Sequence, residues 1–149
     1  MKRDIKKLIV HHTGGRLGRL DSPGLIRLRH KYLRGFDDIG YHYVIGAGVL
    51  TEDGKVYEGR DVELVGAHAK GSNSDSIGVV LIGDLNKNSA TRKQFESLVD
   101  LLAENCRRYG IYAGDIYGHK EVSNDTSCPG RYLNMHYVRR MVKDKLAAS

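Results

Sequence analysis

The sequence is poor in several residue types that mark particular classes of protein. Its 149 residues include no tryptophan, two phenylalanines and two cysteines. No stretch approaches the roughly 18 consecutive apolar residues of a membrane-spanning helix, so membrane insertion is not expected. The two cysteines, Cys106 and Cys128, form no disulfide-rich pattern, and we expect no structural disulfide. The length fits one domain with a single core, and we predict one soluble domain over residues 1–149.

The N-terminus also lacks the features of a secretory signal. Its charged residues are followed by the apolar run Leu8–Val10, which stops at His11. A signal peptide needs about 7–15 apolar residues and a cleavage site with small residues. We therefore expect the chain to be made and folded in a cytoplasm.

The formal net charge of +6 raises the question of nucleic-acid binding, because clustered basic side chains attract phosphate. The basic residues are instead spread along the chain, notably over Arg16–Arg34 and Arg139–Lys145, and few aromatics are available to stack on bases. Solvated helix faces are the leading interpretation, and attraction to an anionic cell envelope is the second. No specific nucleic-acid partner is predicted.

Hydrophobic patterning predicts strands alternating with helices. Runs rich in β-branched and aromatic residues predict strands at Ile5–Val10, Gly40–Ile45, Glu52–Tyr57, Ile77–Gly83 and Ile116–Tyr117. Capping residues and helical spacing predict helices at Asp21–Gly35, Thr91–Tyr109 and Tyr132–Ala148. The second and third strands read as a hairpin around Asp53-Gly54. This order predicts an α/β fold: a three-layer single domain with a mixed central β-sheet flanked by helices.

Three residues that commonly bind metals lie beside these strands or in a turn. His11 follows the first strand, His119 follows the last one, and Cys128 lies in the turn Ser127–Gly130. Each alone has an ordinary structural explanation, such as a buried histidine or a small buried thiol. A catalytic zinc needs three protein ligands and an open fourth position for water or substrate, so the three residues are candidates for such a site.

The sequence resembles the zinc-dependent N-acetylmuramoyl-L-alanine amidases, which include small phage endolysins, and the related peptidoglycan recognition proteins. The resemblance covers nearly the whole chain. It rests on five blocks in the family's order, which are Ile9–Thr13, Gly40–Tyr43, Ala67–Gly71, Ser76–Gly83 and Gly118–Gly130.

The resemblance implies a set of zinc ligands. The first histidine of the family's pair corresponds to His11, which leaves His12 as a neighbour; the other two ligands correspond to His119 and Cys128. Cys128 would bind as a thiolate, favoured by the ion itself. The cofactor implied is Zn²⁺, which lowers the pKa of its water towards about 7 and polarises the scissile carbonyl.

The resemblance also implies two catalytic residues, Tyr41 and Thr126. The phenol of Tyr41 is expected to orient the attacking water or to donate to the developing oxyanion, and packing in the core is the alternative. Thr126 lies where some phage enzymes have Lys and catalytic recognition proteins have Thr. Its hydroxyl would hydrogen-bond the tetrahedral intermediate, and a turn role is the alternative. Eight residues separate His119 from Cys128, where the family more often has seven, so the role of Thr126 stays open.

Three further residues have assigned roles. His68, in a polar loop, is expected to contact substrate, with a loop-stabilising hydrogen bond as the alternative. His42 is interpreted as structural, because it points to the sheet face opposite Tyr41. Glu121 is interpreted as a partner that orients a metal ligand.

The implied reaction is hydrolysis of the amide between N-acetylmuramic acid and the L-alanine of peptidoglycan. The expected setting is a monomeric phage endolysin without a separate cell-wall-binding domain. It would be made in the host cytoplasm and act on the periplasmic wall after membrane permeabilisation. The alternatives are a cytoplasmic amidase that recycles muropeptides, a non-catalytic peptidoglycan-binding module, and a cysteine hydrolase with Cys128 as nucleophile and His119 as base. Some phage members also bind the phage RNA polymerase, and the basic N-terminus leaves that question undecided.

Overall fold

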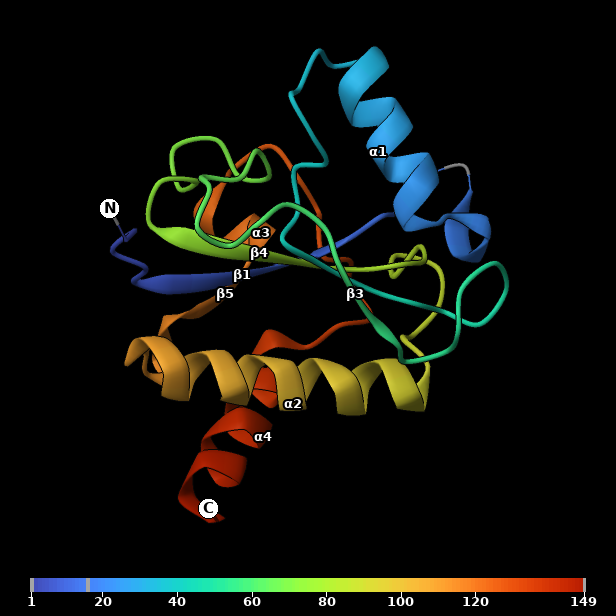
Figure 1. The fold of residues 1–149 in the computed structure, drawn as a ribbon. Helices are drawn as coiled ribbons and strands as arrows, with labels where there is room; N and C mark the ends of the chain where they lie inside the picture. The colour runs from blue at the N-terminus through green and yellow to red at the C-terminus, as the bar shows by residue number, and fades with distance from the viewer. Residues whose placement is uncertain (1, 16, 149) are drawn as a thin grey trace.

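A five-stranded mixed sheet forms the middle layer of the computed structural model, which describes residues 2–15 and 17–148 (Figure 1). The strands lie in the order β3-β2-β4-β1-β5. Their bounds are β1 Lys7–His12, β2 Tyr43–Ile45, β3 Val56–Glu58, β4 Ser76–Leu81 and β5 Ile116–Gly118. β1 pairs in parallel with β4 and β5, β2 pairs in parallel with β4, and β2 and β3 form an antiparallel hairpin. The predicted mixed sheet is confirmed.

The middle of the sheet is its most buried part. All six residues of β4 are buried, as its near-continuous apolar run predicts for a central parallel strand. β1 lies beside β4 and is buried from Leu8 to His12. The hairpin strands are shorter than predicted, and β2 begins at Tyr43 rather than Gly40.

Helices cover both faces of the sheet (Figure 1). α2 (Arg92–Tyr109) and α4 (Met135–Ala148) lie on one face, and α1 (Pro23–Tyr32) lies on the other. α2 matches its prediction: Thr91 and Gln94 form a capping box at its start, and Gly110 ends it with φ 68°. The three-layer architecture is confirmed.

The last helix begins later than predicted. α4 starts at Met135 instead of Tyr132, because the side chain of Asn134 accepts a hydrogen bond from the Tyr137 N–H (3.1 Å) and so caps the helix at that point. Three short elements are not predicted from the sequence, since three or four residues show no helical periodicity: η1 (Gly18–Leu20), η2 (Ala113–Asp115) and α3 (His119–Val122).

Two apolar clusters fill the spaces between the layers. The larger one lies between the sheet and α2 and α4, and it contains Cys106. The smaller one packs Ile26 of α1 against the other face of β2 and β4. Side chains alternate between these two clusters along β2, β3 and β4. The same alternation of a strand decides which residues of β1 reach the candidate site.

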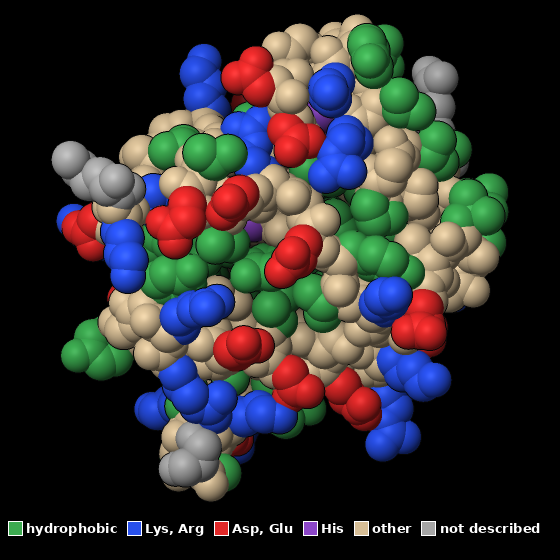
Figure 2. Space-filling model, in the orientation of Figure 1, with side chains coloured by type: hydrophobic (Ala, Val, Ile, Leu, Met, Phe, Trp, Pro, Cys, Tyr) green, Lys and Arg blue, Asp and Glu red, His purple; other side chains and the backbone are tan. Residues whose placement is uncertain are grey.

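On the face shown in Figure 2, basic and acidic side chains are interspersed rather than gathered into one basic patch. This distribution agrees with solvated helix faces as the main explanation for the net charge of +6. None of the helices in residues 2–15 and 17–148 combines the length and the apolar content that crossing a lipid bilayer requires.

Candidate metal centre

The carboxyl end of β1 carries the first candidate ligand. His11 and His12 are consecutive on this strand, so their side chains point to opposite faces of the sheet. His11 faces the α1 side, where its ring lies 5.1 Å from the ring of Tyr41 and 4.9 Å from that of His68, between centroids. The side chain of His11 is buried.

His119 reaches the same place from the neighbouring strand. β5 runs parallel to β1 and pairs Gly118 with Val10, so the residues that follow each pair lie side by side at the carboxyl edge of the sheet. The ring centroids of His11 and His119 are 4.7 Å apart. Adjacent parallel strands thus bring together two histidines that are 108 positions apart in the sequence.

Cys128 lies in the turn that follows α3. Its Sγ atom is 3.6 Å from Nδ1 of His11 and accepts a hydrogen bond from the backbone N–H of His12 (3.3 Å). The turn packs closely on Gly118, where an added Cβ would lie 2.9 Å from the ring of Pro129. Glycine before His119 therefore allows the cysteine turn to approach β5.

The donor set fits a zinc ion. One ligand atom from each of His11, His119 and Cys128 lies within 4.8 Å of the other two. Zinc bonds of about 2.0–2.1 Å to nitrogen and 2.3 Å to sulfur, at a tetrahedral angle, separate the two donors by about 3.6 Å. The observed distance from His11 Nδ1 to Cys128 Sγ has this value.

Burial sets the protonation of the cluster. It lowers the pKa of His11 well below its ordinary value and also lowers the pKa of His119, so both rings are neutral and able to bind a metal. It raises the pKa of the Cys128 thiol to about 12. A thiolate at this position therefore needs a cation beside it, and a bound divalent metal supplies one.

The cluster lines a cavity of about 380 Å³. Tyr41, on the segment before β2, borders this cavity beside His11, as the predicted catalytic role requires. Its second ring neighbour is His30 of α1, 5.4 Å away between centroids. Burial raises the pKa of the Tyr41 phenol, so the hydroxyl keeps its proton and can donate it in a hydrogen bond.

Thr126 also lines the cavity, and its hydroxyl oxygen accepts a hydrogen bond from the Cys128 N–H (3.1 Å). This contact is a turn interaction, and it leaves the hydroxyl proton free to donate to another group. The next residue, Ser127, accepts a hydrogen bond from Asn86 (2.9 Å), which connects the cysteine turn to the loop after β4. The catalytic role of Thr126 stays a prediction.

His68 lines the cavity too, but both of its ring nitrogens have protein partners. Nδ1 lies 2.8 Å from Nε2 of His11, and Nε2 lies 3.2 Å from the hydroxyl of Ser76. Contact between His68 and substrate stays a prediction. Its contact with His11 was missed by the sequence analysis, because 57 positions separate the two residues and no local pattern connects them.

His42, predicted to be structural, and Glu121, predicted to orient a metal ligand, have well-defined partners. His42 Nδ1 accepts a hydrogen bond from the Gly78 N–H (3.0 Å), and its Nε2 lies 2.9 Å from the carbonyl oxygen of Leu64, so its role is structural. Glu121 accepts from the Gly118 N–H (2.8 Å) and forms an ion pair with Arg139 of α4 (2.7 Å). Glu121 thus holds the turn that carries His119.

Comparison with known proteins agrees with this geometry. The family model described as N-acetylmuramoyl-L-alanine amidase matches residues 1–131. Peptidoglycan-recognition protein SC2 of Drosophila simulans is 38% identical over 128 residues, which cover 82% of this chain and 66% of that protein. The match thus spans about two thirds of the length of this relative.

Two solved structures share the fold. The endolysin N-acetylmuramoyl-L-alanine amidase LysCS from Clostridium intestinale URNW is 31% identical and matches with a TM-score of 0.82, over 93% of this chain and 83% of that one. A mutant of Drosophila PGRP-LB in complex with tracheal cytotoxin is 31% identical, with a TM-score of 0.74, over 89% of this chain and 79% of that one. By sequence and by structure, the chain belongs to the N-acetylmuramoyl-L-alanine amidase family.

Proposed function

We propose that the protein is a zinc-dependent hydrolase that cleaves the amide between N-acetylmuramic acid and L-alanine in peptidoglycan. The observation that carries the proposal is the convergence of His11, His119 and Cys128 at the wall of a 380 Å³ cavity. Three ligands beside an open cavity match a catalytic zinc site rather than a closed structural one. Membership of the amidase family supports the choice of bond.

Each residue at the cavity has a separate task in this reaction. Zinc held by the three ligands supplies a water of lowered pKa and a Lewis acid for the scissile carbonyl. Tyr41 donates a hydrogen bond from its phenol to the carbonyl oxygen as negative charge develops there. Thr126 offers a second, neutral donor while its oxygen holds the N–H of Cys128. The cavity walls orient the stem peptide.

Two rival functions explain the site less well. Proteins of this fold that bind peptidoglycan without cutting it typically lack a metal ligand, whereas His11, His119 and Cys128 all converge here. A cysteine hydrolase needs a thiolate nucleophile, whereas burial raises the pKa of Cys128 to about 12.

We further propose the biological setting of an endolysin, with peptidoglycan as the partner and the periplasmic wall as the site of action. The support is the similarity to LysCS, which is described as an endolysin. In this setting the enzyme is made in the host cytoplasm and reaches the wall after the membrane is permeabilised. A cytoplasmic amidase that recycles muropeptides would use the same centre on soluble fragments.

Digestion of purified peptidoglycan tests the proposed reaction. The digest should release stem peptides with new N-terminal L-alanine, and mass spectrometry should find glycan strands of unchanged length. A glycosidase would instead shorten the glycan strands, and it needs two carboxylates, whereas Asp84 is the one acidic residue among those described as lining the cavity. Shortened glycan strands with stem peptides attached would refute the assignment.

A further inference from the structure

The contact between His11 and His68 gives His68 a task that is separate from substrate binding. We propose that His68 is a positioning residue that fixes the ring orientation of His11 and the ring nitrogen that carries its proton, so that Nδ1 faces the metal. The inference rests on the proposed zinc site, because it assigns a task to a neighbour of one ligand.

The hydrogen bonds determine which ring nitrogen carries the proton, first in His68 and then in His11. The Ser76 hydroxyl donates its one proton to the carbonyl oxygen of Ser72 (2.6 Å), so its oxygen must accept from Nε2 of His68 (3.2 Å). A neutral His68 with its proton on Nε2 has a bare Nδ1. Nδ1 lies 2.8 Å from Nε2 of His11, which must therefore be the donor.

The remaining nitrogen of His11 is then free for the metal. With its proton on Nε2, His11 has a lone pair on Nδ1, and this is the atom 3.6 Å from Cys128 Sγ. In the opposite tautomer of His11, the proton would be on Nδ1 and would block binding of the metal there. The lone pairs of His11 Nε2 and His68 Nδ1 would then face each other without a proton between them. The contact with His68 therefore selects the tautomer that can bind zinc.

The ring of His68 is itself held in place. It lies against Gly78 of β4, where an added Cβ would be 2.5 Å from the ring atom Cγ of His68. The backbone N–H groups of His68 and Ala69 both donate to the side-chain oxygen of Asn73 (2.9 and 2.8 Å). The loop and the strand together leave one orientation for the ring.

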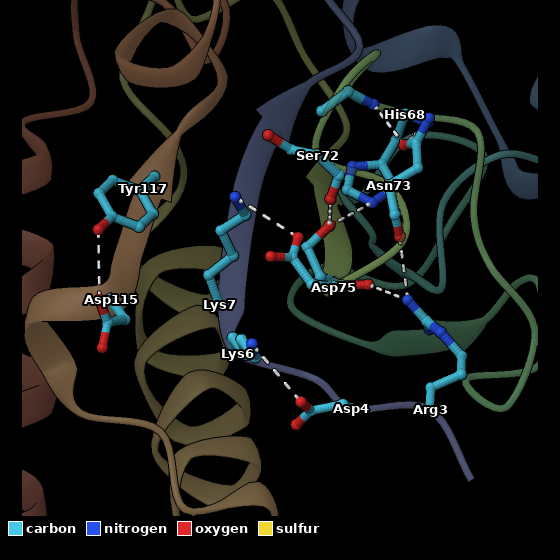
Figure 3. A network of polar contacts seen from close by, with 12 residues as sticks. Arg3, Asp4, Lys6, Lys7, His68, Ser72, Asn73, Asp75, Asp115 and Tyr117 are labelled. Atoms are coloured by element: carbon cyan, nitrogen blue, oxygen red, sulfur yellow. Dashed lines mark hydrogen bonds and ion pairs between the residues drawn. The ribbon is translucent and has the colours of Figure 1, made fainter.

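Arg3 of the N-terminal segment hydrogen-bonds to the end of this loop (Figure 3). Its guanidinium donates to the carbonyl oxygens of Asn73 (3.0 Å) and Ser76 (2.6 Å), and also to those of Val62 (2.7 Å) and Leu64 (3.1 Å). These four backbone acceptors belong to two segments, and the second segment contains Asn73 and Ser76, which orient His68. The side chain of Arg3 therefore holds these residues in place. The support for His11 thus extends to the N-terminal segment.

Zinc affinity, measured by competition with a chelator in the absence of substrate, tests the inference. His68→Ala should weaken zinc binding by roughly 10–100-fold, the usual cost of losing an outer hydrogen-bond partner of a ligand. His68→Asn keeps an acceptor near the position of Nδ1 and should restore the affinity to within a few-fold. His136→Ala removes an exposed histidine of α4 and serves as the matched control, with unchanged affinity. If His68→Ala binds zinc as tightly as the wild type and only raises KM, His68 is a substrate contact and the inference fails.

Nitrogen NMR of the metal-free wild type gives a second readout that does not depend on any variant folding. The expected result is a proton on Nε2 and none on Nδ1 in both His11 and His68. A proton on Nδ1 of His11 would overturn the inference. Ser76→Ala removes the acceptor for His68 and should increase the alternative tautomer. Failure of the wild type to bind zinc would refute the proposed function, whereas the tautomer measurement still reports on the contact between the two histidines.

Discussion

His11 and His12 are adjacent on β1, yet they serve opposite sides of the sheet. Nδ1 of His11 lies 3.6 Å from Cys128 Sγ, whereas Nδ1 of His12 accepts a hydrogen bond from the backbone N–H of Leu85 (3.0 Å). The alternation of a strand therefore separates a candidate ligand from a residue that anchors the loop after β4.

This separation predicts opposite results for two neighbouring substitutions. His11→Ala should weaken zinc binding by more than the roughly 10–100-fold that loss of an outer partner costs, because it removes a ligand. His12→Asn keeps an acceptor for the Leu85 N–H and should retain one zinc per chain. Elemental analysis of both purified variants measures this. Equal zinc loss in the two would show that the pair does not divide its roles in this way.

Tyr41→Phe should lower turnover by roughly 10²–10³-fold, as expected for the loss of one donor to an oxyanion. The substitution keeps the ring that packs between His11 and His30, so zinc content and folding should not change. Single-turnover rates on a purified muropeptide, with zinc content determined on the same sample, test this. Turnover within a factor of about three of the wild type would assign Tyr41 to packing alone.

Local patterns were sufficient to predict most of the fold. The continuous apolar run of β4 indicates a central strand, and the capping box at Thr91 and glycine at 110 mark both ends of α2. The start of α4 was placed three residues early, because the apolar Leu133 continues the helical pattern although the cap is at Asn134. α3 was missed because one turn of helix has no periodicity.

The candidate site was predicted only in part, because some of its contacts depend on the tertiary structure. His11, His119 and Cys128 were identified by family resemblance, and they lie together in the structure. The contact of His68 with His11 depends on the ring lying over Gly78, which a sequence does not show. Arg3 lies in a basic N-terminal stretch and looks like a solvated charge, yet its guanidinium binds four backbone carbonyls. No local signal distinguishes such an arginine from an exposed one.

Thr126 has two possible tasks, and two substitutions separate them. Thr126→Val removes the hydroxyl and keeps the shape of the side chain. If the hydroxyl donates to the reacting oxygen, turnover of the zinc-loaded variant should fall roughly 2–10-fold, the value of a neutral hydrogen bond. Thr126→Ser should restore it. If Thr126→Val lowers only the free energy of unfolding or the zinc affinity, the turn contact with the Cys128 N–H is its whole role.

The stability of the protein should fall between pH 6.5 and pH 4. Burial, the largest cause, lowers the pKa of His30 and of His42 from an ordinary value near 6.5 to about 4. Within this range the unfolded chain binds protons at these positions and the folded chain does not, so the free energy of unfolding decreases as the pH falls. From pH 7 to pH 5, each histidine should cost about 2 kcal/mol of stability.

His30→Asn isolates one of these contributions. Nδ1 of His30 accepts a hydrogen bond from the Gly40 N–H (2.8 Å), and an asparagine oxygen can take over that bond without titrating. Urea unfolding at pH 7 and pH 5, with equal zinc loading, should show a smaller loss of stability in this variant than in the wild type. His136→Asn replaces an exposed histidine and should keep the full loss. The buried neutral state of His30 would be refuted if His30→Asn lost as much stability as the wild type, because its protonation would then not be linked to unfolding.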